Sequence, residues 1–270
     1  MTLAVPKTDN ILFQNPVPSV PMEKVLAVDL DGTLLHPEPE AIAVWSRSRY
    51  QYMSAMAARL LEEISHQMPV AIASARNAQS VKILVDQLPQ VNFCGFVTEN
   101  GLVARRHLHP VANGSEWDIV ANLLPDWLRI TGYEQCLGLI PPTSVDNPEA
   151  ILRSVLCQTA KHGHIYLDRH KIFVYPTLAN KLSGLEKLGL QPWMALGNDL
   201  NDWEMLGHAL HPATLADAHE KVKDVVKSKE GGYCSPAISH AGTRDILLWI
   251  QSLCASRRSS IGPVEGGVGM

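Results

Sequence analysis

The sequence predicts an α/β fold: a parallel sheet between helices, interrupted by a smaller α+β domain. Short apolar runs at residues 25–28, 68–73 and 192–196 each end in polar residues and are followed by helical patterns. Such runs are typical of strands buried on both faces, as in parallel sheets. From about residue 102 to 176 the pattern changes to amphipathic helices and paired short strands. Helices together with antiparallel strands indicate a small domain inserted into the larger one.

The composition excludes several classes of protein. The chain has 270 residues, 46% hydrophobic and 19% charged, enough for one large domain or two modest ones. A net charge of -4 and a pI near 6.2 argue against a nucleic-acid surface. No apolar run reaches the length of about 18 residues that a membrane span needs, and the start lacks the pattern of a signal peptide. Five scattered cysteines without a CxxC pair indicate reduced thiols and a cytoplasmic protein.

The first predicted strand, residues 25–28, ends in two acids, Asp29 and Asp31, followed by Gly32 and Thr33. The carboxyl ends of strands are where open α/β sheets bind ligands. Two carboxylates this close repel each other and are stable together mainly with a cation between them, and oxygen ligands suit magnesium. Gly32 allows a sharp turn, and Thr33 adds a hydroxyl and a backbone amide. The alternative is a plain Asx-turn with two solvated acids.

The next two strand ends also carry polar residues. Residues 68–73 are followed by Ser74-Ala75-Arg76-Asn77, where a hydroxyl and backbone amides at a helix N-terminus form an anion site. An ordinary N-cap serine is the alternative. Residues 93–98 are followed by Glu99-Asn100-Gly101, in which Asn-Gly is a strong turn signal.

Two later segments complete the pattern. Lys181 opens a predicted helix, where the helix dipole disfavours a cation unless an anion lies nearby. The strand at residues 192–196 ends in Gly197-Asn198-Asp199-Leu200-Asn201-Asp202, and a helix begins near Met205.

Taken in order, these segments resemble the four motifs of the haloacid dehalogenase (HAD) superfamily phosphatases. The resembling branch is subfamily IIB, which includes Cof-type proteins and phosphatases of sucrose phosphate and mannosyl-3-phosphoglycerate. The resemblance covers about residues 24–250, the cap matching only in size and position. It implies a Rossmann-like parallel sheet core with an inserted α+β cap of the C2 type. The expected division is an irregular extension at 1–21, a core at 22–101 and 177–256, a cap at 102–176 and a flexible tail at 257–270.

The resemblance also implies an activity and roles for the motif residues. It implies a magnesium-dependent phosphomonoester hydrolase that acts on a small sugar phosphate or related metabolite through an aspartyl-phosphate. Asp29 would be the nucleophile, and Asp31 the acid and base. The remaining expected roles are phosphate binding by Ser74, Lys181, Thr33 and Gly32, substrate contacts by Arg76, Asn77 and Asn100, and Mg²⁺ binding by Asp29, Asp31, Asn198, Asp199 and Asp202. Asp202 is expected to act mainly by holding waters or Lys181.

Two positions depart from the family pattern. The second motif reads Ser74-Ala75-Arg76 where this branch has Thr-Gly-Arg, which keeps the hydroxyl and the arginine. Asn198 stands where the family usually has the metal-binding Asp. An amide oxygen can bind magnesium but brings no charge, and Asp199 is an alternative ligand. Two other functions therefore stay open: a sugar phosphomutase, and a sugar-phosphate-binding protein without activity.

The other elements are predicted from hydrophobic periodicity and turn residues. The predicted helices are 41–66, 79–88, 117–128, 149–160, 218–227 and 242–256. The further predicted strands are 102–106, 164–167, 171–175 and 213–216. Residues 231–234 are predicted to form a loop able to close over the site.

Overall fold

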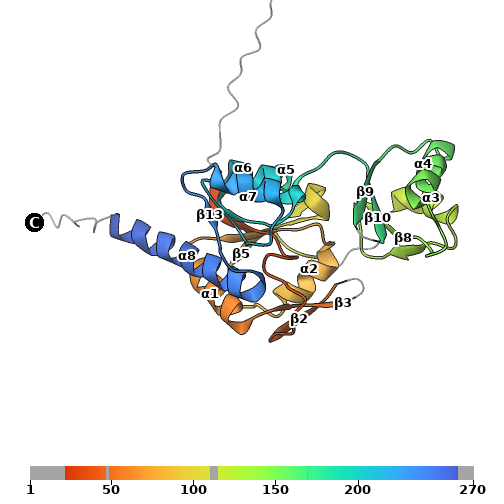
Figure 1. Cartoon of the computed structure of the whole chain (residues 1–270). Helices are drawn as coiled ribbons and strands as arrows, with labels where there is room; N and C mark the ends of the chain where they lie inside the picture. Colours follow the sequence, from red (N-terminus) through yellow and green to blue (C-terminus); the bar gives the residue numbers. More distant parts are fainter. Residues whose placement is uncertain (1–21, 47–48, 110–114, 169, 261–270) are drawn as a thin grey trace, which may run out of the picture.

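The computed structural model describes residues 22–46, 49–109, 115–168 and 170–260. These residues form a core with a central sheet between helices, and a smaller cap beside it (Figure 1). This arrangement confirms the predicted α/β class.

The core sheet has seven strands in the order β13-β12-β11-β1-β4-β5-β6. Its strands are β1 (Glu23–Val28), β4 (Val70–Ala73), β5 (Phe93–Thr98), β6 (Val103–Arg105), β11 (Leu190–Leu196), β12 (His211–Thr214) and β13 (Tyr233–Cys234). β1 lies in the middle and pairs in parallel with β11 and β4. Its carboxyl end therefore lies beside the carboxyl ends of both neighbours.

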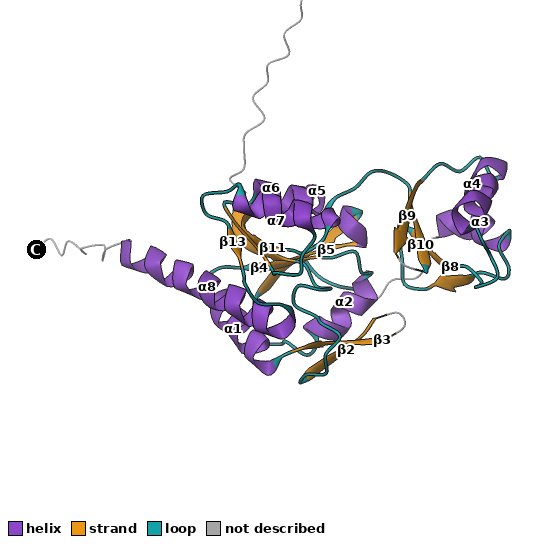
Figure 2. Ribbon diagram, in the orientation of Figure 1, coloured by secondary structure: helices purple, strands orange, loops and turns teal. Residues whose placement is uncertain are grey.

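Helices cover both faces of this sheet (Figure 2). Alternate residues of β1 face opposite layers: Leu26 and Val28 pack in one apolar cluster, Val25 and Ala27 in another. The first cluster includes residues of α1 (Ala55–Ser65), α2 (Ala78–Val85) and α8 (Ser239–Ser260). The second includes residues of α5 (Lys181–Lys187), α6 (Trp203–His208) and α7 (Glu220–Lys227). Burial on both faces explains why the core strands are continuous apolar runs.

The cap is a four-stranded antiparallel sheet with two helices. Its strands are β7 (Leu128–Ile130), β8 (Leu137–Ile140), β9 (His164–Asp168) and β10 (Lys171–Tyr175), in the order β7-β8-β10-β9. Its helices are α3 (Asp118–Asn122) and α4 (Pro148–Gln158). Ile172 and Val174 of β10 pack in a cluster with residues of both helices, whereas Phe173 and Tyr175 pack in a separate small cluster. The second face is thus available to line a cavity.

The prediction of one helix over residues 41–66 is wrong. β2 (Ile42–Ser46) and β3 (Arg49–Met53) pair as antiparallel strands, and of the described residues in this range only those of α1 are helical. Trp45 and Tyr50 are cross-strand partners with ring centroids 4.9 Å apart, a contact typical of paired strands. Ser54 ends the hairpin and caps α1, accepting a hydrogen bond from the Ala57 N–H.

Other predicted boundaries also differ from the structure. The helix expected at 117–128 is shorter, because α3 ends at Asn122 before Pro125 and β7 follows. The loop expected at 231–234 contains β13, which extends the core sheet. β6 pairs with β5, so residues 103–105, expected in the cap, belong to the core sheet.

The other predicted helices correspond to helices of the structure. The helices expected at 79–88, 149–160, 218–227 and 242–256 correspond to α2, α4, α7 and α8. α8 runs on to Ser260, into the expected tail. The extension at 1–21 and residues 261–270 lie outside the described residues. Within the described part of the chain, no helix is long and apolar enough to cross a membrane.

Candidate active site

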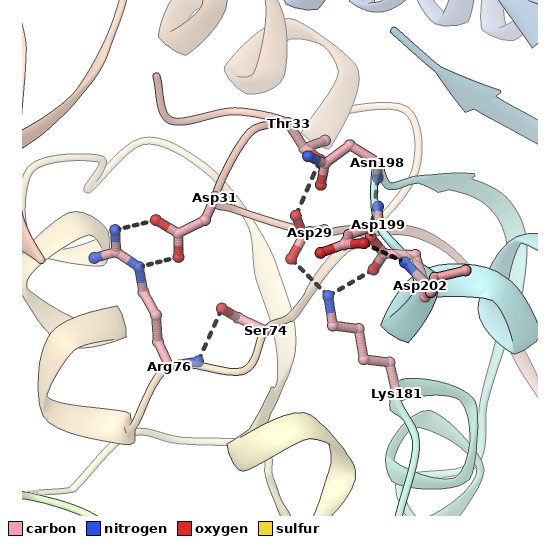
Figure 3. A network of polar contacts seen from close by, with 10 residues as sticks. Asp29, Asp31, Thr33, Ser74, Arg76, Lys181, Asn198, Asp199 and Asp202 are labelled. Atoms are coloured by element: carbon pink, nitrogen blue, oxygen red, sulfur yellow. Dashed lines mark hydrogen bonds and ion pairs between the residues drawn. The ribbon is translucent and has the colours of Figure 1, made fainter. Parts of the chain in front are cut away.

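Three predicted residues meet at the carboxyl ends of the central strands (Figure 3). Asp29 directly follows β1, Lys181 is the first residue of α5, and Asp202 lies in the turn before α6. The Lys181 ammonium Nζ donates to Asp29 Oδ1 at 2.6 Å and to Asp202 Oδ1 at 2.5 Å. All three side chains are buried. The helix-terminal position of Lys181 predicted an anion nearby, and two carboxylates contact it in the structure.

The charges of this trio are not balanced. Two carboxylates share one ammonium, so the fully ionised trio carries one excess negative charge. Burial raises the pKa of the Asp29 carboxyl above its ordinary value, although the Lys181 ammonium opposes this effect. Burial acts to lower the pKa of Lys181, but the carboxylates of Asp202 and Asp29 outweigh it and raise that pKa. Lys181 is therefore charged, and the trio favours a further cation nearby.

Asp202 also fixes the loop that carries Asn198. Its Oδ2 accepts hydrogen bonds from the backbone N–H groups of Asn198 at 2.9 Å and Asp199 at 3.1 Å. Both oxygens of the Asp202 carboxylate thus accept hydrogen bonds from Lys181 or from this loop. This arrangement fits the expected role of holding Lys181.

Asp31 has a different environment from Asp29. Arg76 donates to both of its carboxylate oxygens, from Nε at 2.7 Å and from Nη2 at 2.6 Å. Arg76 is buried, whereas the Asp31 side chain is 45% exposed. The Arg76 Nη1 also donates to Ser80 Oγ at 3.0 Å, which fixes the guanidinium against α2. Arg76 therefore orients Asp31, whereas the sequence analysis gave it a substrate contact.

The loop after β4 places the other predicted anion ligands. Ser74 is buried, lines the cavity described below, and accepts a hydrogen bond from the Arg76 N–H at 3.1 Å. Asn77 caps α2 through the Ser80 N–H and donates to the Thr131 carbonyl of the cap at 2.9 Å. Asn77 thus joins the core to the cap.

Asn100 faces the same cavity from a left-handed backbone conformation, with φ of 56°. Its Oδ1 is buried, and no hydrogen-bond partner for it is found in the described part of the chain. A buried polar atom usually has a partner. Asn100 is therefore placed to contact a bound molecule.

Oxygen atoms from three segments converge beside Asp29. Thr33 Oγ1 lies 3.0 Å from Asp29 Oδ2 and 3.2 Å from the Asn198 amide. The same end of that amide lies 3.3 Å from Asp29 Oδ2 and 3.1 Å from the Asp31 carbonyl oxygen. Gly32, with φ of 79°, makes room for this packing, because a Cβ there would come 2.2 Å from Asn198 Nδ2.

The Asn198 amide has two orientations with opposite consequences. In one orientation the amide oxygen points toward Asp29 and the Asp31 carbonyl. The oxygens of Asn198, Asp29 and Asp31 then converge as the ligands of a cation do, and only the Thr33 hydroxyl donates a hydrogen bond among them. With its nitrogen there, the two N–H bonds of the amide have three acceptors within reach, and the amide takes the place of a cation. The first orientation fits magnesium on Asp29, the Asp31 carbonyl and Asn198.

The described residues offer no richer metal cluster. Across residues 22–46, 49–109, 115–168 and 170–260, no group of three His, Cys, Asp or Glu side chains is placed to hold a metal. The Asp199 carboxylate lines the cavity and accepts the Leu200 N–H at 2.7 Å, at the start of a short helical turn. A cation here would therefore rely on an amide and a carbonyl oxygen in addition to Asp29.

A cavity of about 460 Å³ opens over these residues and reaches the cap. Its core wall includes Asp29, Asp31, Ser74 and Asn198. The β2–β3 hairpin and the segment before it form a second wall, with His36, Glu38, Arg49 and Gln51. The β9–β10 hairpin of the cap forms a third, with Tyr166, Asp168, His170, Lys171, Phe173 and Tyr175.

The sequence analysis missed the second and third walls. The β2–β3 hairpin was mistaken for a helix, although the alternation Arg49-Tyr50-Gln51-Tyr52 has the period of a strand. The β9 and β10 strands were predicted, but no motif marked their side chains as part of a site. No signal in the sequence identified the residues of the third wall.

The comparisons with solved structures agree with this fold. A haloacid dehalogenase-like hydrolase from Bacteroides thetaiotaomicron is similar, with a TM-score of 0.62, 16% sequence identity, and coverage of 84% of this chain and 99% of that one. A sugar phosphatase of HAD subclass IIB gives a TM-score of 0.55 and 16% identity, over 84% of this chain and 98% of its own. A trehalose-6-phosphate phosphatase related protein gives a TM-score of 0.55 and 13% sequence identity, over 86% of this chain and 99% of its own.

No family model matches the sequence, and the search of curated proteins found no match. The structural neighbours are HAD-like hydrolases, and the chain has their fold: a Rossmann-like core with an inserted α+β cap. This confirms the fold that the motif resemblance implied.

Proposed function

We propose that this chain is a HAD-type phosphatase: a magnesium-dependent phosphomonoester hydrolase for a small sugar phosphate. The observation that carries the proposal is the buried contact of Lys181 with both Asp29, which lines the cavity, and Asp202. A lysine held on a carboxylate orients it and neutralises charge as a phosphate approaches. The motif order and the fold of the neighbours support the same function. The substrate is a free small molecule, and the compartment is the cytoplasm.

In the first step, the Asp29 carboxylate attacks the phosphorus of the ester in line with the leaving oxygen. The new O–P bond forms as the bond to the sugar oxygen breaks, giving an aspartyl-phosphate and the sugar alcohol. Thr33 and Lys181 fix the carboxylate through hydrogen bonds of 3.0 Å and 2.6 Å. The Ser74 hydroxyl, which lines the cavity, holds another phosphate oxygen.

Asp31 acts as the general acid and then as the general base. It donates one to the leaving sugar oxygen, and then takes one from the water that hydrolyses the aspartyl-phosphate to release inorganic phosphate. Its ion pair with Arg76 favours the carboxylate, so proton donation requires that substrate binding move Asp31 away from the guanidinium. The 45% exposure of its side chain leaves room for that movement.

Asp29, the Asp31 carbonyl and Asn198 would hold the magnesium ion, with Asp199 as an alternative ligand. When bound, the ion would neutralise charge on the phosphate and on the carboxylates. The excess negative charge of the Asp29, Lys181 and Asp202 trio supports a cation there.

The residues that line the cavity support a sugar as the alcohol part of the phosphate ester. The cap supplies the rings of Tyr166, Phe173 and Tyr175 together with the charged Asp168 and Lys171. Apolar ring faces with a few polar groups suit a molecule that has both hydroxyl groups and apolar C–H faces.

The test is phosphate release from a panel of sugar phosphates, with and without added magnesium. We expect magnesium-dependent release from one or a few of them. No release from any, in a protein shown to be folded, would reject the proposal. Binding without release would then favour a sugar-phosphate-binding protein, because the Asn198 nitrogen can take the place of a cation. Transfer of phosphate between sugar positions would favour a phosphomutase.

A further inference from the structure

A carboxylate outside the catalytic trio joins the core to the cap. Glu99 directly follows β5 and is completely buried. Its Oε1 accepts a hydrogen bond from the backbone N–H of Glu134 at 2.7 Å, and its Oε2 from those of Gln135 and Cys136, both at 2.9 Å. These three residues lie in the cap, in the turn between β7 and β8. Successive backbone N–H groups arranged in this way form a concave site for an anion.

The charge of Glu99 is held by backbone dipoles. Burial raises the pKa of the Glu99 carboxyl, and the hydrogen bonds from the three N–H groups of the cap oppose that effect. A buried carboxylate without such donors would be strongly destabilising. The carboxylate and the cap turn therefore stabilise each other only while the cap is in this position.

The backbone of the same turn is bound to the phosphate-site loop. The Glu99 N–H donates to the Arg76 carbonyl at 2.9 Å, and the Asn100 N–H to the Ser74 carbonyl at 3.1 Å. Glu99 and Asn100 both have positive φ, 51° and 56°. Such conformations cost free energy in residues with a side chain, and they persist where surrounding contacts fix them. One residue thus contacts the loop of Ser74 on one side and the cap on the other.

The chain also returns from the cap at this turn. Gly101 packs so closely on the segment after β10 that a Cβ would come 1.9 Å from the Asn180 carbonyl oxygen. Two other core side chains hold the β7–β8 turn: Asn77 donates to the Thr131 carbonyl, and Arg105 pairs with the Glu134 carboxylate. The turn at Glu99–Gly101 thus contacts the β7–β8 turn of the cap and the segment through which the chain re-enters the core.

We propose that Glu99 is a positioning residue that sets the orientation of the cap over the active site. It does not line the cavity, so it acts through the cap, whose β9–β10 hairpin lines one wall. This inference rests on the proposed phosphatase function. It concerns substrates large enough to reach the cap, because only these depend on where that wall lies.

The test compares wild-type protein with Glu99→Gln, which keeps the shape of the side chain. Glutamine has one acceptor oxygen in place of two, and its NH₂ group would face N–H donors. We expect faster hydrogen exchange at the amides of Glu134, Gln135 and Cys136. We also expect kcat/KM for glucose 6-phosphate, or for the best sugar phosphate of the panel, to fall by about 10- to 100-fold. For p-nitrophenyl phosphate, a small substrate, it should stay within about twofold.

The matched control is Glu116→Gln, which removes an exposed cap carboxylate paired with Lys161 at 3.7 Å. This variant should change neither hydrogen exchange at residues 134–136 nor kcat/KM for either substrate. Unchanged exchange at residues 134–136 in Glu99→Gln, or equal losses for both substrates, would overturn the proposal. So would rapid exchange of these amides in the wild-type protein, a result that needs no variant. Wild-type protein that hydrolyses neither substrate would instead reject the phosphatase function, and the exchange data alone would then decide whether Glu99 holds the cap.

Discussion

The core and cap walls of the cavity are built in different ways. On the core side, buried charges lie directly behind the lining: Lys181 and Asp202 hold Asp29, Arg76 holds Asp31, and Asp29, Arg76, Lys181 and Asp202 are each at most 5% exposed. On the cap side, the lining comes from an antiparallel hairpin whose outer strand is half exposed, with Tyr166 at 46%. The core wall is therefore backed by buried ion pairs, and the cap wall is a mixed surface that can change without disturbing the core sheet.

This difference separates chemistry from substrate choice. Changes in the core wall should affect every substrate, because all of them present the same phosphate. Changes in the cap wall should affect only the substrates that reach it. The four variants below test this separation, beginning with the largest expected effect.

Asp29→Asn should abolish turnover, by roughly 10⁴-fold or more, for sugar phosphates and p-nitrophenyl phosphate alike. The fold should survive, because the change removes the excess negative charge of the trio and leaves Lys181 paired with Asp202. Phosphate release and thermal unfolding measure the two effects. Full activity in this variant would contradict the assignment of the nucleophile.

Lys181→Met should lower the free energy of unfolding by about 3–5 kcal/mol, because it leaves two buried carboxylates without their cation. Activity should be lost with it. Lys82→Met is the control: its side chain is 41% exposed and pairs with Asp86 on the surface of α2. That control should cost less than about 1 kcal/mol. Equal unfolding curves for the two variants would show that the buried trio is not ionised as described.

Asn198→Asp should tighten binding of magnesium by about 10-fold or more, because it adds a charged ligand. Without the metal, it should be less stable than wild type, since a second carboxylate would face Asp29. Titration calorimetry with Mg²⁺ and metal-free unfolding measure these effects. Asn201→Asp adds the same charge in the same loop and serves as the control. Equal changes in affinity from both variants would assign the effect to general electrostatics.

Tyr166→Ala should have the smallest effect. Loss of an aromatic contact of about 0.5–1.5 kcal/mol corresponds to roughly a 2- to 12-fold rise in KM for the sugar phosphate. The KM of p-nitrophenyl phosphate should not change. A similar rise for both substrates would remove the distinction between the two walls.

The core could be predicted from the sequence because its elements leave local signals. Continuous apolar runs mark the parallel strands, and polar residues at their ends fall at one edge of the sheet. The resemblance to the HAD motifs then implied that Lys181 holds Asp29 and that Asp202 holds waters or Lys181, although Asp29 and Lys181 are 152 positions apart. The β2–β3 hairpin was missed because its apolar residues also fit a helical period when read together with α1.

The contacts of Glu99 and of Arg76 could not be predicted from the types of the residues involved. The partners of Glu99 are backbone N–H groups, which every residue except proline has, so the sequence cannot show which of them a carboxylate will contact. The ion pair of Arg76 with Asp31 depends on how two loops turn after their strands. The Asn-Gly turn explained residues 99–101 locally and concealed their contact with the cap.

The path of α8 has a practical consequence. Ser239, at its beginning, lines the cavity, and the helix of 22 residues then leads away from the cap (Figure 1). At 1.5 Å per residue it spans about 33 Å. β1, near the other end of the described chain, starts at the sheet edge opposite its catalytic end. An affinity tag, a fluorescent reporter or a solid support joined directly at Met22 or at Ser260 would thus start away from the cavity, which makes surface-immobilised assays of residues 22–260 feasible.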